Sequence, residues 1–341
     1  MKISSRYIGC FSDIHLGLGQ DSKQWHEIAL NFAKWASEYY KENSIDEIII
    51  PGDIFHNRSE VSVETLDIAK RFFDYFKDFT IYISTGNHDC YYKDNSSVNS
   101  ISILAGWNNI KIIDSKPELI ETNYDKKIAL IPWGTEIKDM PNSDIMFAHL
   151  EISSFYMNGH KMCEHGMESK NLFDKTKFVV SGHFHKKDHR KYDKGDILYL
   201  GSPFQHNFGD LGDSRGIYVF DVKESTFKFI ENNISPKHYR LTPESEIKED
   251  IVKNNIISLV INDKNDEKTI LEFSSKISTL SPINLRIDYE KPKDEIMVND
   301  EDKEYKADNI LKSIEEYIKT LDIENKKEVE ECIKTIYNSL I

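Results

Sequence analysis

Several protein classes are excluded by what the sequence contains in small amounts. Only 4 of the 341 residues are cysteine, and no two of them form a Cys-x-x-Cys pair, which argues against a disulfide framework or a cysteine-bound zinc ion. The 9 prolines and 15 glycines are too few for a collagen-like or low-complexity chain. There is no apolar run long enough to span a membrane and no apolar core of a signal peptide. We therefore expect a cytoplasmic protein with reduced thiols and no membrane partner.

Positive charge is also in short supply. The chain carries 44 lysines and arginines against 58 aspartates and glutamates, a formal net charge of -14. A protein that binds nucleic acid through bulk electrostatics alone has the opposite balance. Binding to nucleic acid stays open only if metal ions or a partner protein supply positive charge locally.

Short apolar runs alternate with amphipathic stretches through the first two thirds of the chain. The runs are continuous, as in strands that are buried on both faces, and residues 25–36 and 66–76 repeat apolar side chains at helical spacing. The pattern predicts an α/β fold with helices outside a β-sandwich. The expected strands are residues 7–11, 47–50, 80–84, 127–131, 144–148, 177–180, 197–200 and 216–220.

The pattern changes near Pro236, which predicts a second, smaller region. We expect one large domain over residues 1–235 and an α+β module over 236–290, in which strands 255–261 and 283–289 flank a helix, 266–280. The next stretch, 291–304, is acidic and poorly patterned, as in a linker. Residues 305–341 then carry two amphipathic stretches, which predict a pair of helices.

Five of the expected strands run directly into polar side chains that can bind metal. In an open α/β sheet the carboxyl ends of neighbouring strands meet at one crevice, so we expect these side chains to converge. Buried acids and imidazoles without a partner would be costly, and a divalent cation removes that cost. The candidate ligands, in chain order, are Asp13, His15, Asp53, Asn87, His149, His183 and His185.

Seven ligands are too many for one ion and suit two ions that share a bridging carboxylate. Such dinuclear sites hold their ions about 3.5–4 Å apart and clamp the attacking and leaving oxygens of a phosphoryl displacement. The mixture of imidazole, carboxylate and amide oxygen suits Mn²⁺, Fe²⁺ or Zn²⁺ better than Mg²⁺ or Ca²⁺. Each motif alone has a plainer interpretation, since Gly-Asp after a strand is usually a turn. Their joint occurrence, in order, favours a metal site.

Two further features have both a functional and a plainer interpretation. His56 could act near a bound phosphate or be a solvated loop histidine. The basic cluster at 186–191, directly after the last ligand motif, could contact a phosphate backbone or be a solvated loop. The sequence alone leaves both alternatives open.

Taken together, the ligand motifs resemble the signature of the calcineurin-like metallophosphoesterase superfamily. The residues that carry the resemblance are Asp13-x-His15, Gly52-Asp53, Gly86-Asn87-His88-Asp89, His149 and Gly182-His183-x-His185. Within that superfamily, the motif Gly-Asp-Ile-Phe-His at 52–56 and the Gly-Ser-Pro segment at 201–203 are similar to SbcD-type nucleases of DNA double-strand-break repair. The chain length and the Ile131-Pro132-Trp133 element are closest to those of their compact phage counterparts. The resemblance covers residues 6–235.

The resemblance implies a four-layer β-sandwich and a Mn²⁺-dependent DNA nuclease. Such nucleases are 3′→5′ exonucleases and single-strand endonucleases that act on DNA ends in recombination and double-strand-break repair. The family pattern makes Asp53 the bridge between two Mn²⁺ ions, for which Mg²⁺, Fe²⁺ or Zn²⁺ could substitute. The remaining ligands would divide between the ions, with Asp13, His15 and His185 on one and Asn87, His149 and His183 on the other.

The resemblance also implies three catalytic residues and several partners. His88 would be the general acid for the leaving 3′-oxygen, Asp89 an orienting residue, and His56 an assisting group near the phosphate. The module at 236–290 corresponds to a capping domain, and 305–341 to the helices by which such nucleases bind an SbcC-like coiled-coil ATPase. A homodimer in a bacterial or phage-infected cytoplasm is also implied. The terminal helices could instead fold back on their own chain.

Two other functions are left open by the sequence. A phosphatase or small-molecule phosphodiesterase on the same fold would not need the terminal helices and would act poorly on DNA. A non-catalytic scaffold would be expected to lack some of the metal ligands, and none of the seven is missing.

Overall fold

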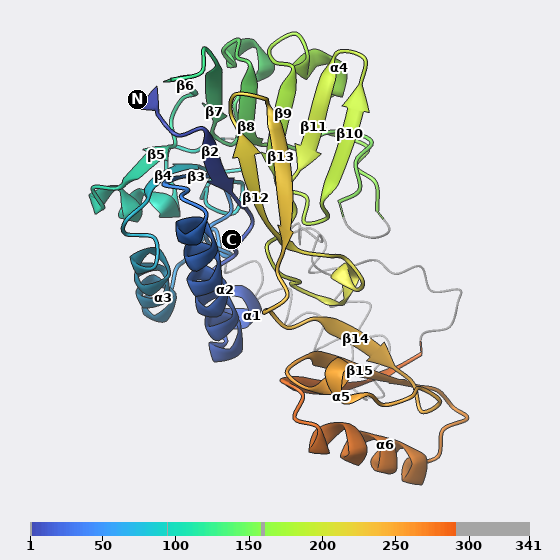
Figure 1. The fold of residues 1–341 in the computed structure, drawn as a ribbon. Helices are drawn as coiled ribbons and strands as arrows, with labels where there is room; N and C mark the ends of the chain where they lie inside the picture. The colour runs from blue at the N-terminus through green and yellow to red at the C-terminus, as the bar shows by residue number, and fades with distance from the viewer. Residues whose placement is uncertain (1, 94, 158–160, 291–341) are drawn as a thin grey trace, which may run out of the picture. The chain divides into compact units, whose positions relative to one another are not determined.

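Two β-sheets packed face to face form the larger part of the fold (Figure 1). The computed structural model describes residues 2–93, 95–157 and 161–290. In spatial order, the six-stranded sheet consists of β13 (Thr226–Glu231), β12 (Gly216–Asp221), β2 (Tyr7–Cys10), β3 (Glu47–Pro51), β4 (Thr80–Ser84) and β5 (Ile110–Ile113). The seven-stranded sheet consists of β1 (Lys2–Ile3), β6 (Glu118–Thr122), β7 (Lys127–Ile131), β8 (Ile145–His149), β9 (Phe178–Gly182), β11 (Gly195–Tyr199) and β10 (Asp188–Tyr192).

One apolar core fills the space between the two sheets. Ile8 and Ile49 from the six-stranded sheet pack in it with Phe147 and Val180 from the seven-stranded sheet. Strands β3, β8 and β9 are buried at every residue. Their continuous apolar sequence follows from this position, because each of these strands is covered on both faces of its sheet.

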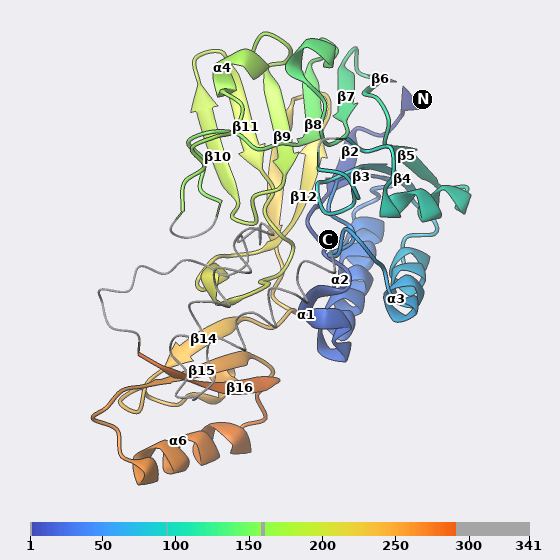
Figure 2. The same ribbon diagram turned by 180° about the vertical axis from the view of Figure 1, so that it is seen from behind.

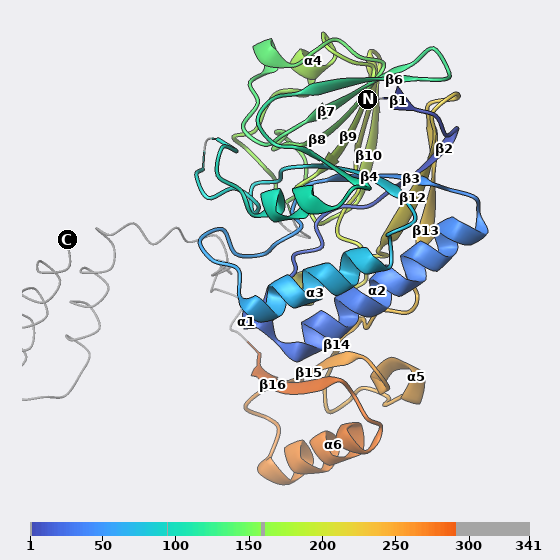
Figure 3. The ribbon, with the colours of Figure 1, turned by 90° about the vertical axis from the view of Figure 1, so that its left-hand side faces the viewer.

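Helices cover the outer face of the six-stranded sheet. Helices α2 (Lys23–Glu42) and α3 (Val63–Asp74) lie side by side along it (Figure 3). Each begins after a serine, Ser22 and Ser62 respectively, whose side chain accepts a hydrogen bond from a backbone N–H of the first turn. Phenylalanines of both helices then pack with isoleucines of β3 and β4 in a second core, as the helical spacing predicts.

The outer face of the seven-stranded sheet is covered mainly by the segment that follows β8. Apolar side chains such as Ile152 and Phe155 pack there with Tyr199 of β11, and the segment includes the short helix α4 (Ser169–Leu172), seen near the upper ends of the strands in Figure 2. The predicted sandwich of two sheets between outer layers is therefore confirmed. The remaining short elements of this region are α1 (Leu18–Asp21) and the 3-10 helices η1 (Ser100–Gly106), η2 (Ile137–Asp139) and η3 (Phe208–Asp210).

A second, smaller sheet follows β13 in the chain. It is parallel and three-stranded, with the order β14 (His238–Leu241), β15 (Ile256–Ile261) and β16 (Asn284–Tyr289). Helices α5 (Glu249–Val252) and α6 (Glu267–Thr279) complete this module. Side chains of α5 and α6 share an apolar cluster with β14 and β15. The two strands and the longer helix expected here are confirmed, whereas β14 was not predicted.

Two predicted regions lie outside the described residues, the acidic linker at 291–304 and the helix pair at 305–341. Within the part of the chain that the structure describes, no helix combines the length and the apolar composition needed to cross a membrane.

Candidate metal centre

The seven candidate ligands converge from two sheets rather than one. The segments after β2, β3 and β4 leave the six-stranded sheet, whereas the ligands of β8 and of the segment at the end of β9 belong to the seven-stranded sheet. The predicted fold was a two-sheet sandwich, so the rule for the edge of one open sheet does not by itself bring all the ligands together. Convergence still occurs because β3 and β8 contact each other across the sandwich, so that ligands from both sheets reach the same place.

The first half of the cluster is centred on His15. Its Nε2 lies 3.0 Å from Nε2 of His185 and 3.4 Å from Oδ2 of Asp53. Ligand atoms of Asp13, His15 and Asp53 all lie within 4.8 Å of one another, and all three residues are buried. Two imidazoles and two carboxylates from three separate segments thus surround one point.

The second half of the cluster is centred on Asn87. Its Oδ1 lies 2.9 Å from Nε2 of His149 and 2.9 Å from Nδ1 of His183. His149 Nε2 is in turn 3.3 Å from Oδ2 of Asp53. Because the same carboxylate oxygen of Asp53 also faces His15, this side chain lies between the two halves.

The donor set fits two divalent cations. Oδ2 of Asp13 is buried and has no hydrogen-bond partner among the described residues, although a buried carboxylate oxygen without a partner is costly. Its other oxygen accepts a hydrogen bond of 3.0 Å from the backbone N–H of His183, which ties the two halves together. A cation beside Oδ2 would satisfy it, and imidazole with carboxylate and amide oxygen suits Mn²⁺, Fe²⁺ or Zn²⁺.

Two glycines let the ligand segments approach this closely. A Cβ at Gly86 would lie only 2.2 Å from Oδ1 of Asp53, and a Cβ at Gly182 would lie 2.2 Å from Oγ of Ser12. Either contact would push one segment away from the other. The glycines of the sequence motifs are therefore required by packing at the centre itself.

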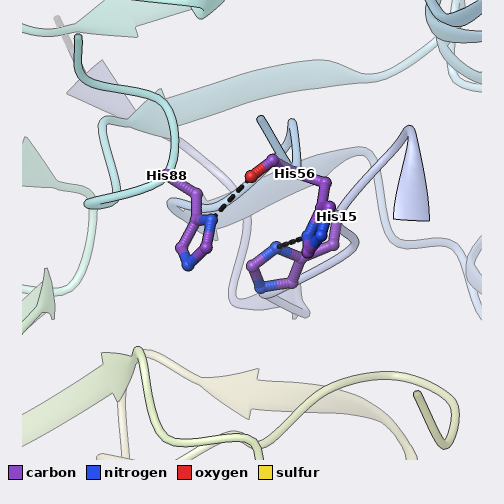
Figure 4. Close-up of side chains that lie close together, drawn as sticks. All are labelled: His15, His56 and His88. Carbon is purple, nitrogen blue, oxygen red and sulfur yellow. Dashed lines mark hydrogen bonds between the residues drawn. The ribbon is translucent and has the colours of Figure 1, made fainter. Parts of the chain in front are cut away.

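His56 and His88 lie beside His15, as Figure 4 shows. Nδ1 of His88 is 2.6 Å from the backbone oxygen of His56, and Nδ1 of His56 is 3.4 Å from Nδ1 of His15. The backbone N–H of His88 also donates to Oδ1 of Asp53 at 2.8 Å. Both histidines are thus placed at the edge of the first half of the cluster.

Asp89 contacts backbone rather than the candidate ligands' side chains. Its carboxylate accepts hydrogen bonds of 2.8–3.1 Å from the N–H groups of Asp53, Ile54, Phe55 and Gly86. Three of these bonds join the segment after β3 to the segment after β4, and the bond from Gly86 lies within the latter segment. Asp89 therefore holds two ligand-bearing segments in a fixed relation.

Comparison with known proteins identifies the family. The model of the family described as calcineurin-like phosphoesterase matches residues 7–187, a span that contains all seven candidate ligands. The chain belongs to this family. It is a metallophosphoesterase, and the two-sheet architecture described above is that family's fold.

Individual relatives and solved structures are also similar to this phosphoesterase. "Exonuclease subunit 1" of Enterobacteria phage T4 is 30% identical over 325 residues, 91% of each chain. "Putative phosphoesterase 078R" of Invertebrate iridescent virus 3 is 26% identical over 235 residues, 63% of this chain and 62% of that protein. Among solved structures, an archaeal phosphodiesterase covers 66% of this chain and 99% of its own, with a TM-score of 0.38 and 15% identity.

The phosphoesterase holds its buried ligands in states that suit a cation. Burial acts to raise the pKa of Asp53, but the charges of His149 and His88 outweigh it and hold that pKa well below the usual 3.8. Burial lowers the pKa of His15 and that of His183 well below 6.5, which leaves these imidazoles neutral. For His149 burial is opposed by the Asp53 carboxylate, which raises the pKa to about 9. A cation next to Asp53 would replace that proton.

Two residues near the centre were not predicted from the sequence to be site residues. The ring of Trp133 lies 5.8 Å from that of His149 and 5.4 Å from that of His183, between centroids. The ring of His206 lies 4.8 Å from that of His185. The seven ligands were selected because each belongs to a metal-ligand motif at the end of a strand. Neither Trp133 nor His206 belongs to such a motif, so this criterion does not select them.

The basic cluster at 186–191 has a structural explanation. Most of it belongs to the edge strand β10, so a solvated loop was the wrong interpretation. Nζ of Lys187 lies 3.7 Å from the ring centre of Phe229, and Arg190 forms an ion pair of 2.7 Å with Asp188. His189 lies 3.0 Å from Asp196. Lys187, Arg190 and His189 therefore make contacts with other residues of the same chain.

Proposed function

We propose that this phosphoesterase is a DNA nuclease, a 3′→5′ exonuclease and single-strand endonuclease on DNA ends, active in recombination and double-strand-break repair. The observation that carries the proposal is the 30% identity to a phage exonuclease subunit across 91% of both chains. The seven clustered ligand side chains support it, because hydrolysis of a phosphodiester needs charge stabilisation at the phosphorus.

The cluster divides into two proposed metal sites with Asp53 between them. Two Mn²⁺ ions would be held there, and when bound they would neutralise the charge that develops on the phosphoryl oxygens. Mg²⁺, Fe²⁺ and Zn²⁺ remain possible substitutes. The proposed ligands are Asp13, His15 and His185 for one ion and Asn87, His149 and His183 for the other, as the two halves of the cluster suggest.

His88 is the proposed general acid for the leaving 3′-oxygen. A backbone carbonyl can only accept, so the contact of 2.6 Å to the oxygen of His56 requires a proton on Nδ1 of His88. Nε2 is then the nitrogen that gains and releases a proton. The proposed role of His56 is to hold this tautomer and to lie near the phosphate, whereas Asp89 positions the ligand segments.

The test is cleavage of linear duplex DNA with Mn²⁺, compared with cleavage of a chromogenic phosphodiester. Asp53→Asn is expected to lower DNA cleavage by more than about 100-fold, since even the outer partners of metal ligands are worth 10–100-fold. Asp67→Asn is the matched control, because Asp67 is 64% exposed and pairs only loosely with Arg71 at 3.9 Å. DNA cleavage that survives Asp53→Asn would refute the metal assignment. A wild-type enzyme that hydrolyses only the chromogenic compound would favour the phosphatase or small-molecule phosphodiesterase alternative.

The proposed partners follow from the same relative and from the charge of the chain. The T4 protein is named as a subunit, and we propose that residues 305–341 bind an SbcC-like coiled-coil ATPase in the cytoplasm of a bacterium or phage-infected cell. A homodimer belongs to the same proposal. With a net charge of -14, the chain would need such a partner to supply much of the positive surface that DNA requires.

A further inference from the structure

His206 is a buried histidine beside the candidate centre, outside the seven motif ligands. It is 5% exposed, and neither of its ring nitrogens has a hydrogen-bond partner among the described residues. Ligand nitrogens of His15, His185 and His206 all lie within 4.8 Å of one another. Its ring centroid is 4.8 Å from that of His185 and 5.3 Å from that of His15.

The segment around His206 is rigidly held. The backbone N–H of His206 donates to Oδ2 of Asp210 at 2.8 Å, and Asp210 forms an ion pair of 2.7 Å with Arg215, both nearly fully buried. Arg215 donates in turn to Oγ of Ser202 at 2.9 Å, at the other end of the segment. The backbone that carries the imidazole is thus fixed by buried hydrogen bonds and an ion pair, as the backbone of a preorganised ligand must be.

Packing alone does not account for a histidine at this position. Phe204 and Trp25 contact the ring, with centroids 5.3 and 6.4 Å away, and an apolar side chain would suit such neighbours without burying two unpaired nitrogens. The Nε2 atoms of His15 and His185 lie 3.0 Å apart. A third imidazole beside this pair is explained by a cation that all three nitrogens share.

We propose that His206 is an additional ligand of the cation held by Asp13, His15 and His185. This inference rests on the dinuclear centre of the proposed function and adds to it a residue from outside the ligand motifs. A third imidazole makes that half of the centre richer in nitrogen than the Asn87 half, which favours Mn²⁺, Fe²⁺ or Zn²⁺ over Mg²⁺ there.

The test is Mn²⁺ binding to the chelator-treated full chain, measured by titration calorimetry. Wild type is expected to bind two Mn²⁺ ions, and His206→Leu is expected to weaken one of the two sites by at least about tenfold and leave the other unchanged. The visible absorption of bound Co²⁺, which reports coordination, should change in the same variant. His189→Leu is the matched control, since His189 lies on the edge strand β10 and pairs with Asp196 of β11.

Stability of the metal-free protein separates a ligand from a structural residue. His206→Leu should leave the metal-free unfolding midpoint unchanged or raise it, because neither ring nitrogen has a partner to lose. If leucine impairs folding, His206→Phe keeps a planar ring, and the same loss of Mn²⁺ affinity is expected. Unchanged affinity and an unchanged Co²⁺ spectrum would overturn the role of His206 alone. Failure of wild type to bind Mn²⁺, or equal binding by Asp53→Asn, would instead overturn the metal centre of the proposed function.

Discussion

At the scale of single residues, the candidate ligands occupy unusual backbone conformations. Asp13, His15, Asp53 and His183 have φ angles of 58°, 52°, 54° and 91°, in the left-handed region that residues with a Cβ rarely adopt. Such conformations cost on the order of 1–3 kcal/mol each and persist only where the surrounding structure imposes them. Here hydrogen bonds hold the backbone: the N–H groups of Ile14 and His15 donate to the oxygen of Asp53 at 2.9 and 3.1 Å, and the N–H of Asp53 donates to Asp89.

His88→Gln separates metal binding from turnover. His88 contacts Asp53 through its backbone N–H and His56 through Nδ1, so a glutamine keeps the backbone bond and removes the imidazole that is proposed to donate the proton. We expect Mn²⁺ affinity by calorimetry to stay within about twofold, while DNA cleavage falls by about 10²–10⁴-fold, the usual contribution of a general acid. His189→Gln should change neither quantity. Loss of Mn²⁺ binding in His88→Gln would assign His88 to the metal shell.

The sequence was sufficient to select residues that the structure brings together, for a physical reason. Each of the seven side chains lies at or just beyond the end of a buried apolar strand, and strand ends are what the sheets gather in one place. His206 instead lies in an irregular segment whose position depends on contacts distant in sequence, and Trp133, two residues beyond β7, has no metal-binding side chain to mark it. No local pattern encodes such a position, so only the three-dimensional structure places them at the centre.

At the scale of elements, helix α2 ends in a hydrogen-bonded motif with one strained residue. The N–H of Ser44 bonds to the oxygen of Lys41 at 3.1 Å, and the N–H of Ile45 bonds to that of Tyr40 at 2.9 Å, which is the Schellman pattern. Ser44 sits at the position that glycine usually occupies, with a φ of 55°. The Cβ of Ser44 therefore strains this left-handed conformation, and a glycine would remove the strain.

Ser44→Gly is expected to stabilise the protein. Relief of the left-handed conformation should raise the free energy of unfolding by about 1 kcal/mol, measured by denaturant titration of the metal-free chain. Ser44 is exposed and precedes β3, whereas Asp53 follows the other end of that strand, so catalysis and Mn²⁺ binding should not change. Ser44→Ala keeps a Cβ and serves as the control. A destabilised Ser44→Gly protein would show that the serine side chain contributes more than its backbone strain costs.

The sequence predicted the buried central strands but not all of the edge strands. β3 and β8 were predicted because burial on both faces leaves a continuous apolar run. β10 is an edge strand of charged and polar residues, and the alternating pattern of β13 leaves it partly exposed. Edge strands are held by backbone pairing with one neighbour and need few apolar side chains. Their sequences therefore resemble those of loops.

At the scale of the whole molecule, the negative net charge of the chain opposes binding of the proposed substrate, DNA, which is also negatively charged. The chain carries -14 charges, and its densest basic cluster, at 186–191, is largely occupied by contacts with its own neighbours. A polyanion such as DNA gains little from such a surface. Binding of DNA would therefore need both the cations at the proposed centre and a basic surface on the partner subunit.

Deletion of residues 305–341 tests where that partner binds. The seven motif ligands and the proposed ligand His206 all precede residue 305, and the last described strand, β16, ends at Tyr289. We therefore expect the shortened chain to keep its Mn²⁺ affinity and its metal-free unfolding midpoint. Association with the SbcC-like ATPase of the same source organism, measured by size-exclusion chromatography with light scattering, should be lost.

A point-variant pair refines the same prediction within the full-length chain. Ile314 belongs to the apolar positions of the first predicted terminal helix, whereas Lys312 belongs to its polar positions. Ile314→Asp should weaken co-elution with the ATPase by at least about tenfold, because a carboxylate would replace an apolar contact, and Lys312→Asp should leave it nearly unchanged. Co-elution that survives both the deletion and Ile314→Asp would place the partner on the described part of the chain instead.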